Sequence, residues 1–277
     1  MEKPRYIDWI VEEKGIVINN NIPIECYKID YVDDESILDD WALHIRRNYI
    51  EDEQLKEDAD VNAMTIEDYL HDIVIPQKGE SLGATARSAD ITEILISDLL
   101  EFVYNYSVPR YKLKNRSGKN NSQQGTDVIA YKYINEDSTP NEKDELVAAE
   151  VKANLSKTDY TPIKNAIIDS KKDEHRLART VDYCRKRLKE LGQLKESEKV
   201  TRFLFKPDNN YKIKYVAAGV SSRENVDEII ELDFSDEELK IRTNDMIFYV
   251  HGKKLMDLVH NIYERCCKWC ASSVQLI

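Results

Sequence analysis

Two short β-rich segments carry the residues whose types and spacing could do chemistry. In Glu145–Ser156, "ELVAAEVKANLS", Glu150 and Lys152 stand two positions apart, near the end of an apolar run typical of a buried strand. Thr126–Ile134, "TDVIAYKYI", opens with Asp127 and is also rich in β-forming residues. Ten residues join the two segments, which is short enough for an antiparallel hairpin.

The pairing of this hairpin decides which side chains meet. We pair Ile134 with Glu145, which places Asp127 opposite Lys152. Because side chains alternate between the two faces of a sheet, Asp127, Glu150 and Lys152 then project from the same face. A slip of two residues keeps this arrangement, whereas a slip of one destroys it. The other face carries a reasonable core: Val128, Ala130, Val147, Ala149 and Val151.

Two carboxylates and an ammonium at the end of a sheet suit a divalent metal site. Mg²⁺ or Mn²⁺ takes oxygen ligands, which Asp127, Glu150 and the backbone carbonyl of Val151 could supply. Such an ion polarises a phosphodiester and lowers the pKa of its bound water. Lys152 could orient that water or stabilise charge on the phosphate. The alternative is that Glu150 and Lys152 are ordinary residues on the solvated face of an edge strand.

The surrounding segments predict helices packed around a mixed sheet, an α/β fold. A helix over Ala89–Tyr106 precedes the hairpin and carries Glu93 in the middle of one face. Other helices are predicted at residues 33–52, 65–75, 160–191 and 253–270, and strands at 17–30, 211–220 and 246–252. The polar stretch Glu51–Asp60 is predicted to be a loop. Trp41, in the first of these helices, is assigned to a core stripe rather than to nucleotide stacking.

The Pro/Gly-containing segment "PQKGESLGATARS" is a candidate boundary between regions. It divides an acidic N-terminal α/β region, residues 1–78, from a second domain, residues 79–277. Residues 30–80 hold 16 acidic residues against 4 basic ones, and the whole chain has a net charge of −12. We predict that the acidic region docks a protein partner, although simple solubility is an alternative reason for its charge.

The middle of the chain is basic and supplies candidate contacts to DNA phosphates. Residues 105–124 hold five basic residues and no acidic one, and residues 153–190 hold ten against six. Such contacts give affinity without sequence preference. The candidates are Lys114, Arg116, Lys119, Lys164, Lys171, Lys172, Arg176 and Arg179. The alternative is that some of those in the second patch pair with Asp169, Asp173 and Asp182.

Cysteine usage and hydropathy predict a cytoplasmic protein. Five cysteines in a chain whose N-terminus is too charged for a secretory signal indicate reduced thiols. Cys267 and Cys270 form a CxxC pair, but no second Cys/His pair with suitable spacing completes a zinc site, so we expect buried, reduced thiols on a C-terminal helix. No apolar run approaches the length needed to span a bilayer, and we expect no membrane association.

Three segments, "TEILISDLL", "GTDVIAYKY" and "AAEVKANLS", resemble the core of PD-(D/E)xK nucleases, a restriction-endonuclease-like fold. In that fold a helix acid, an aspartate opening the second strand and an ExK on the third form the metal site. Carried over by position, the resemblance implies catalytic roles for Glu93, Asp127, Glu150 and Lys152. Thr126 replaces the proline of the family's PD pair, and Asp98 and Glu101 remain alternatives for the helix acid.

Over most of the chain, "WALHIRRNYI", "LGATARSADITEILISDLL", "GTD" and "AEVKANLS" together resemble the HamA family of Hachiman anti-phage defence. The resemblance implies a metal-dependent DNA nuclease, of little sequence specificity, that forms a heterodimer with a HamB-like superfamily 2 helicase and is controlled by it. The chain has no GxxxxGK[ST] phosphate loop, so ATP use would reside in the partner. The alternative is a catalytically inactive nuclease-like module that binds DNA or a protein.

Overall fold

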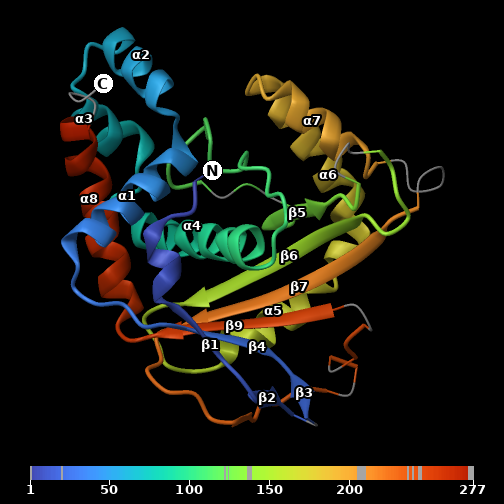
Figure 1. Cartoon of the computed structure of the whole chain (residues 1–277). Helices are drawn as coiled ribbons and strands as arrows, with labels where there is room; N and C mark the ends of the chain where they lie inside the picture. The colour runs from blue at the N-terminus through green and yellow to red at the C-terminus, as the bar shows by residue number, and fades with distance from the viewer. Residues whose placement is uncertain are drawn as a thin grey trace.

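A six-stranded mixed sheet forms the centre of the molecule (Figure 1), in the order β1-β4-β9-β7-β6-β5. The computed structural model describes residues 2–19, 21–121, 123, 125–135, 139–204, 210–235, 237–238, 240–242 and 245–273. The strands of this sheet are β1 (Ile10–Glu13), β4 (Glu25–Ile29), β5 (Val128–Lys132), β6 (Glu145–Asn154), β7 (Lys212–Ser221) and β9 (Asp245–Gly252). A smaller sheet contains β3 (Ile22–Pro23), β2 (Val17–Ile18) and β8 (Ile229–Ile230).

Helices cover both faces of the large sheet, which confirms the predicted mixed α/β architecture (Figure 1). One face is covered by α1 (Glu35–Tyr49), α4 (Gly83–Asp98) and α8 (Leu255–Ser273), and the other by α5 (Thr161–Ser170) and α6 (Asp173–Glu190). The remaining helices are α2 (Asp52–Val61), α3 (Ile66–Tyr69) and α7 (Leu194–Thr201). Short non-α turns occupy Arg5–Trp9, Leu70–Val74 and Leu99–Val103, the last of which prolongs α4 as a π-turn.

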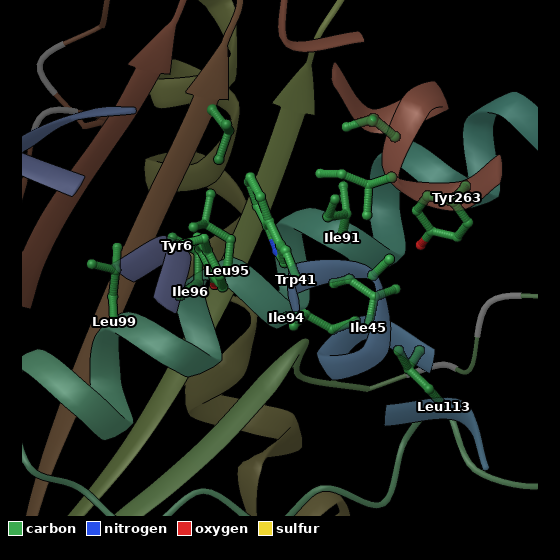
Figure 2. Close-up of a cluster of buried hydrophobic side chains, with 14 of the residues drawn as sticks. Tyr6, Trp41, Ile45, Ile91, Ile94, Leu95, Ile96, Leu99, Leu113 and Tyr263 are labelled. Atoms are coloured by element: carbon green, nitrogen blue, oxygen red, sulfur yellow. The ribbon is translucent and has the colours of Figure 1, made fainter. Parts of the chain in front are cut away.

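The main core lies between one face of the large sheet and the helices α1, α4 and α8. Figure 2 shows Trp41 and Ile45 of α1 beside Ile94 and Leu95 of α4. Trp41 is buried and stacks on Tyr6, with ring centroids 3.9 Å apart. The prediction that Trp41 belongs to a core stripe is therefore confirmed. This packing fixes α4 against the sheet, which matters because α4 carries Glu93.

The hairpin forms with the predicted faces and a register two residues away from the predicted one. Val128 pairs with Ala149, whereas the predicted pairing places Val128 opposite Val151. Because the slip is even, no side chain changes face. The five apolar residues predicted to share a face all lie in the main core. The ladder ends at Val128, so Asp127 stands just beyond it, beside Glu150 and Val151.

The N-terminal residues share this sheet and core with the rest of the chain. β4 pairs in parallel with β9, and β1 pairs with β4. The main core cluster includes residues from Tyr6 to Cys267. The predicted division at residue 78 therefore does not separate two packing units. Parallel pairing between strands more than two hundred residues apart leaves no local signal in the sequence.

In two places the structure has a helix where the sequence predicts a loop or a boundary between regions. The stretch Glu51–Asp60, predicted to be a loop, lies almost wholly in α2, which buries Leu55 and Ala59 on one side of an otherwise charged helix. The predicted boundary segment contains the first turns of α4, which begins at Gly83. In both places the apolar residues are too few for a clear helical period, and tertiary packing selects the helix.

Gly219 permits the close approach of α5 to β7. A Cβ atom at Gly219 would lie 2.6 Å from the backbone nitrogen of Ile163, at the start of α5. We expect Gly219→Ala to lower the free energy of unfolding by about 1–3 kcal/mol, because backbone has to shift to remove the overlap. Urea denaturation measures this loss. Gly79→Ala is the matched control, since its Cβ would meet nothing within 4 Å; equal stability loss in both variants would contradict the argument.

Candidate active site

Asp127 is held directly beside the Glu150–Lys152 pair. Gly125, with φ of +118°, turns the chain into β5, a backbone conformation that favours glycine. The side chain of Asp127 then accepts a hydrogen bond at Oδ2 from the backbone N–H of Val151, at 2.9 Å. Val151 is the residue between Glu150 and Lys152. The structure thus brings together the three charged residues that the hairpin argument predicts.

Glu93 joins the cluster from α4 through a lysine. The Nζ of Lys112 lies 3.1 Å from Glu93 Oε2 and 3.1 Å from Asp127 Oδ1. By contrast, Asp98 and Glu101, which lie further along the same helix than Glu93, both pair with Arg110. Of the three acids considered for the helix position, Glu93 is therefore the one joined to Asp127. Lys112 is a site residue that the sequence analysis missed, because it lies in a loop without periodicity.

Glu150 and Lys152 are enclosed by charged groups of α5 and α6. Lys152 Nζ lies 2.6 Å from Glu150 Oε1 and 3.0 Å from Asp169 Oδ2. Arg176 contacts the other oxygen of Glu150, and its Nε lies 2.6 Å from Asp173 Oδ1. The predicted alternative for Arg176, pairing with Asp173, is thus observed. Glu150 is only 4% exposed, so it is not an ordinary residue on a solvated strand.

Negative charge is crowded in this cluster. Burial raises the pKa of Glu93 to about 8; Lys112 opposes this, but the charges of Asp127 and Asp90 reinforce it. Burial, followed by the charge of Asp127, also raises the pKa of Glu150, although Lys152 opposes the change. Burial is thus the main cause of both shifts, and a neighbouring carboxylate adds to each. A further cation near these carboxylates would favour their charged form.

The cluster opens onto a cleft of about 460 Å³ between α4 and the end of β6. Glu93, Asp127 and Lys152 line it together with uncharged residues such as Thr92 and Asn154. The oxygens of Glu93, Asp127 and Glu150 do not form a group of ligand atoms all within 4.8 Å of one another. Lys112 lies between two of them. A metal bound by all three would have to take over contacts now made by these cations.

The DNA contacts predicted in the first basic patch are paired with acidic residues. Lys114 pairs with Glu51, and Arg116 pairs with Asp90. Both side chains are about 5% exposed, which leaves no surface for a DNA phosphate. Lys119 pairs with Glu80 at 2.7 Å. The pairing partners lie far away in the sequence: just before α2, in α4 and in the segment before α4. We therefore withdraw Lys114 and Arg116 as DNA contacts.

The second basic patch is more exposed, but several of its members have partners. Lys164 and Lys171 donate to backbone carbonyls of residues 233, 237 and 238. Lys172 pairs with Asp169 at 2.5 Å and keeps 63% of its side chain exposed. Arg179 is exposed and has no ion pair with the described residues. Lys172 and Arg179 are the candidates best placed to meet a phosphate, and DNA contact remains a prediction for the whole patch.

The fold and the cluster together define an α/β protein whose mixed sheet presents carboxylates and lysines at the end of a hairpin. The HamA family model matches residues 4–266 of the 277. The chain therefore belongs to the HamA family and is a protein of Hachiman antiviral defence, a system in which it has a partner. No curated protein matches the chain. Among the described helices, none has the length and apolar character required to cross a bilayer.

Proposed function

We propose that the chain is a metal-dependent DNA nuclease of the PD-(D/E)xK type, which hydrolyses phosphodiesters with little sequence preference. The observation that carries this proposal is the position of Asp127. It is hydrogen-bonded to the residue between Glu150 and Lys152 and shares Lys112 with Glu93. A module that only binds DNA has no need for three carboxylates next to a phosphate, because like charges repel.

The donor set fits Mg²⁺ or Mn²⁺ in its chemistry. Asp127, Glu150 and the backbone carbonyl of Val151 would hold the ion, with Glu93 beside them, and all of these are hard oxygen donors. When bound, the ion would polarise the phosphodiester and lower the pKa of an attacking water. The pKa values of Glu93 and Glu150 are raised mainly by burial and further by the charge of Asp127, and a bound dication would oppose both shifts.

Lys152 is suited to stabilise charge on the phosphate. Although burial lowers the pKa of Lys152, its hydrogen bond with Glu150 raises it overall, so the side chain stays an ammonium. Its side chain is 32% exposed and lines the cleft. An ammonium in this position can donate hydrogen bonds to a phosphate oxygen as negative charge develops there. Glu150 and Asp169 restrict where that ammonium lies.

Lys152→Met is expected to reduce DNA cleavage by roughly 10²-fold, the usual cost of losing one donor to developing charge. The rate of single-turnover cleavage at saturating protein measures this loss. Lys157→Met is the matched control, since Lys157 is exposed on the loop after β6. If Lys152→Met cleaves as fast as the Lys157→Met control, Lys152 has no part in the reaction.

For regulation, we propose a heterodimer with a HamB-like superfamily 2 helicase. The acidic N-terminal region is the docking surface we assign to it, because residues 30–80 carry 16 acidic residues against 4 basic ones. Part of that charge is used internally: Glu51 and Asp52 pair with Lys114, Arg46 and Arg47. The acids at the start of α3 and those of α2 beyond Asp52 remain for a basic partner surface.

The proposed function is tested on linear duplex DNA with the chain alone, and with the helicase partner and ATP. Cleavage is expected with Mg²⁺ or Mn²⁺ and is expected to stop in EDTA. Both preparations are needed because a partner that restrains the nuclease would alter what the isolated chain does. DNA binding without cleavage in every combination would support the inactive-module alternative instead.

A further inference from the structure

A second group of potential metal ligands lies on the sheet, apart from the hairpin cluster. It consists of Glu13 at the end of β1, Cys26 on β4 and His251 on β9. β1, β4 and β9 are adjacent strands. Glu13 is paired with Cys26, and Cys26 with Tyr249, two residues before His251. Because side chains two apart share a face, the three residues project from the same side of the sheet.

The three side chains converge on one point. The Oε2 of Glu13 lies 2.9 Å from His251 Nε2 and 3.9 Å from Cys26 Sγ. All three ligand atoms lie within 4.8 Å of one another, and within the described residues no other group of three such ligands does so. In a tetrahedral zinc site, ligand atoms are separated by about 3.3–3.8 Å. Small side-chain adjustments would therefore bring all three onto one ion.

The imidazole of His251 is already oriented for metal binding. Its Nδ1 donates to the carbonyl oxygen of Arg223 at 2.9 Å, since a carbonyl can only accept. Its ring stacks on Tyr249, with centroids 5.7 Å apart. A ligating histidine commonly donates its second N–H to a backbone carbonyl in this way. The guanidinium of Arg223 is directed to Asp227, at 2.9 Å, so its charge is balanced.

The facing atoms of His251 and Glu13 are both atoms that bind metals. Because Nδ1 donates to the carbonyl of Arg223, a neutral His251 presents a lone pair at Nε2 to the Glu13 carboxylate oxygen, 2.9 Å away. A divalent ion bound here would accept the lone pairs of both groups.

We propose that Glu13, Cys26 and His251 form a site for a thiolate-binding divalent cation of the zinc class. Sulfur and imidazole donors select zinc over Mg²⁺, so this site and the proposed nuclease site would bind different ions. Three protein ligands leave one tetrahedral position for water. The site would tie β1, at the edge of the sheet, to β9 across β4. It would thus fasten the N-terminal strands of the chain to the sheet that carries the hairpin.

Loading this site should change the protonation of Cys26. Burial, reinforced by the charge of Glu13, raises the pKa of the Cys26 thiol to about 12. A coordinating thiol is deprotonated outright, so binding should release protons. Proton release therefore accompanies metal uptake if Cys26 is a ligand.

The test is the metal content and the cobalt spectrum of the purified full chain, with any histidine tag removed. We expect about one zinc per chain by mass spectrometry, and a thiolate-to-cobalt absorption band when Co²⁺ replaces it. Cys26→Ser should abolish the band. Cys184→Ser is the matched control, because Cys184 is also a buried free thiol but lies on α6 in another core cluster, and it should keep the band.

Glu13→Gln is a second test variant. It is expected to fold, because Glu13 is 32% exposed and lies on an edge strand. It should weaken zinc binding by roughly 100-fold or more, given that even outer contacts of a metal site are worth 10–100-fold. Folded wild-type protein with no bound zinc and no cobalt band would overturn the proposal, as would a band that survives Cys26→Ser. These measurements do not depend on DNA cleavage, so this proposal and the proposed nuclease function fail independently.

Discussion

Replacing Glu150 with glutamine should reduce DNA cleavage by about 10³-fold and leave DNA binding nearly unchanged. The loss of one carboxylate weakens the hold on the metal ion, whose charge stabilisation is worth several kcal/mol, and each 1.4 kcal/mol is about tenfold in rate. Glutamine is preferable to alanine because Glu150 is buried and contacts both Lys152 and Arg176. Glutamine has the same shape and keeps one acceptor oxygen for either Lys152 or Arg176. Cleavage rates and fluorescence anisotropy with labelled DNA measure the two quantities separately.

The same substitution on α4 distinguishes the candidate helix acids. Glu93→Gln should also impair cleavage, since Glu93 is joined to Asp127 through Lys112. Glu101→Gln should leave cleavage intact, because Glu101 contacts Arg110 instead. Equal activity of the Glu150→Gln and Glu101→Gln variants would refute the metal site. Equal loss in the Glu93→Gln and Glu101→Gln variants would point to a general effect on folding.

Local periodicity was sufficient to predict how the hairpin presents its charged residues. The alternation of small apolar residues in Val147–Val151 determines which face is core, and an even register slip leaves that assignment unchanged. The identity of the helix acid could not be obtained in this way. Glu93, Asp98 and Glu101 lie on one helix, and what separates them is the partner each finds, Lys112 or Arg110. Those partners come from a loop, where the sequence carries no period.

Charge is the property for which sequence reasoning was least reliable. The basic stretch at residues 105–124 suggests a nucleic-acid surface, yet Lys114 and Arg116 form ion pairs with acidic residues of the N-terminal half. A run of like charges in the sequence shows only which residues are present. Whether their side chains can contact a ligand depends on the ion pairs that they form in the folded protein. The same reasoning applies to Arg176, which neutralises Glu150 and Asp173. Pairs between distant segments follow from the fold, and they cannot be read from either segment alone.

Asp98→Asn should lower the free energy of unfolding by about 3–5 kcal/mol at neutral pH, because it removes one carboxylate of the buried ion pair with Arg110. Asp98 is fully buried and accepts hydrogen bonds from Arg110 (2.6 Å) and Tyr6 (2.5 Å), with His44 at 2.9 Å. Although burial raises the pKa of Asp98, His44 and Arg110 bring it down to about 2. A carboxyl group whose pKa is lower in the folded than in the unfolded protein stabilises the fold at pH values above its unfolded pKa. The stability difference from wild type should therefore be complete above about pH 5 and shrink as the pH falls towards 2.

Urea denaturation at several pH values measures this difference, with Asp182→Asn as the control. Asp182 also pairs with basic residues, Arg185 and Lys186, but on the solvated face of α6, where an ion pair contributes little. If Asp98 has a structural role, the folded variant keeps its affinity for Mg²⁺, and its activity falls only with the unfolded fraction. A fully stable Asp98→Asn protein that had lost Mg²⁺ binding would assign the helix acid to Asp98. Stability and metal affinity, measured together, thus distinguish a structural acid of α4, expected to be Asp98, from the acid that α4 presents to the cleft, expected to be Glu93.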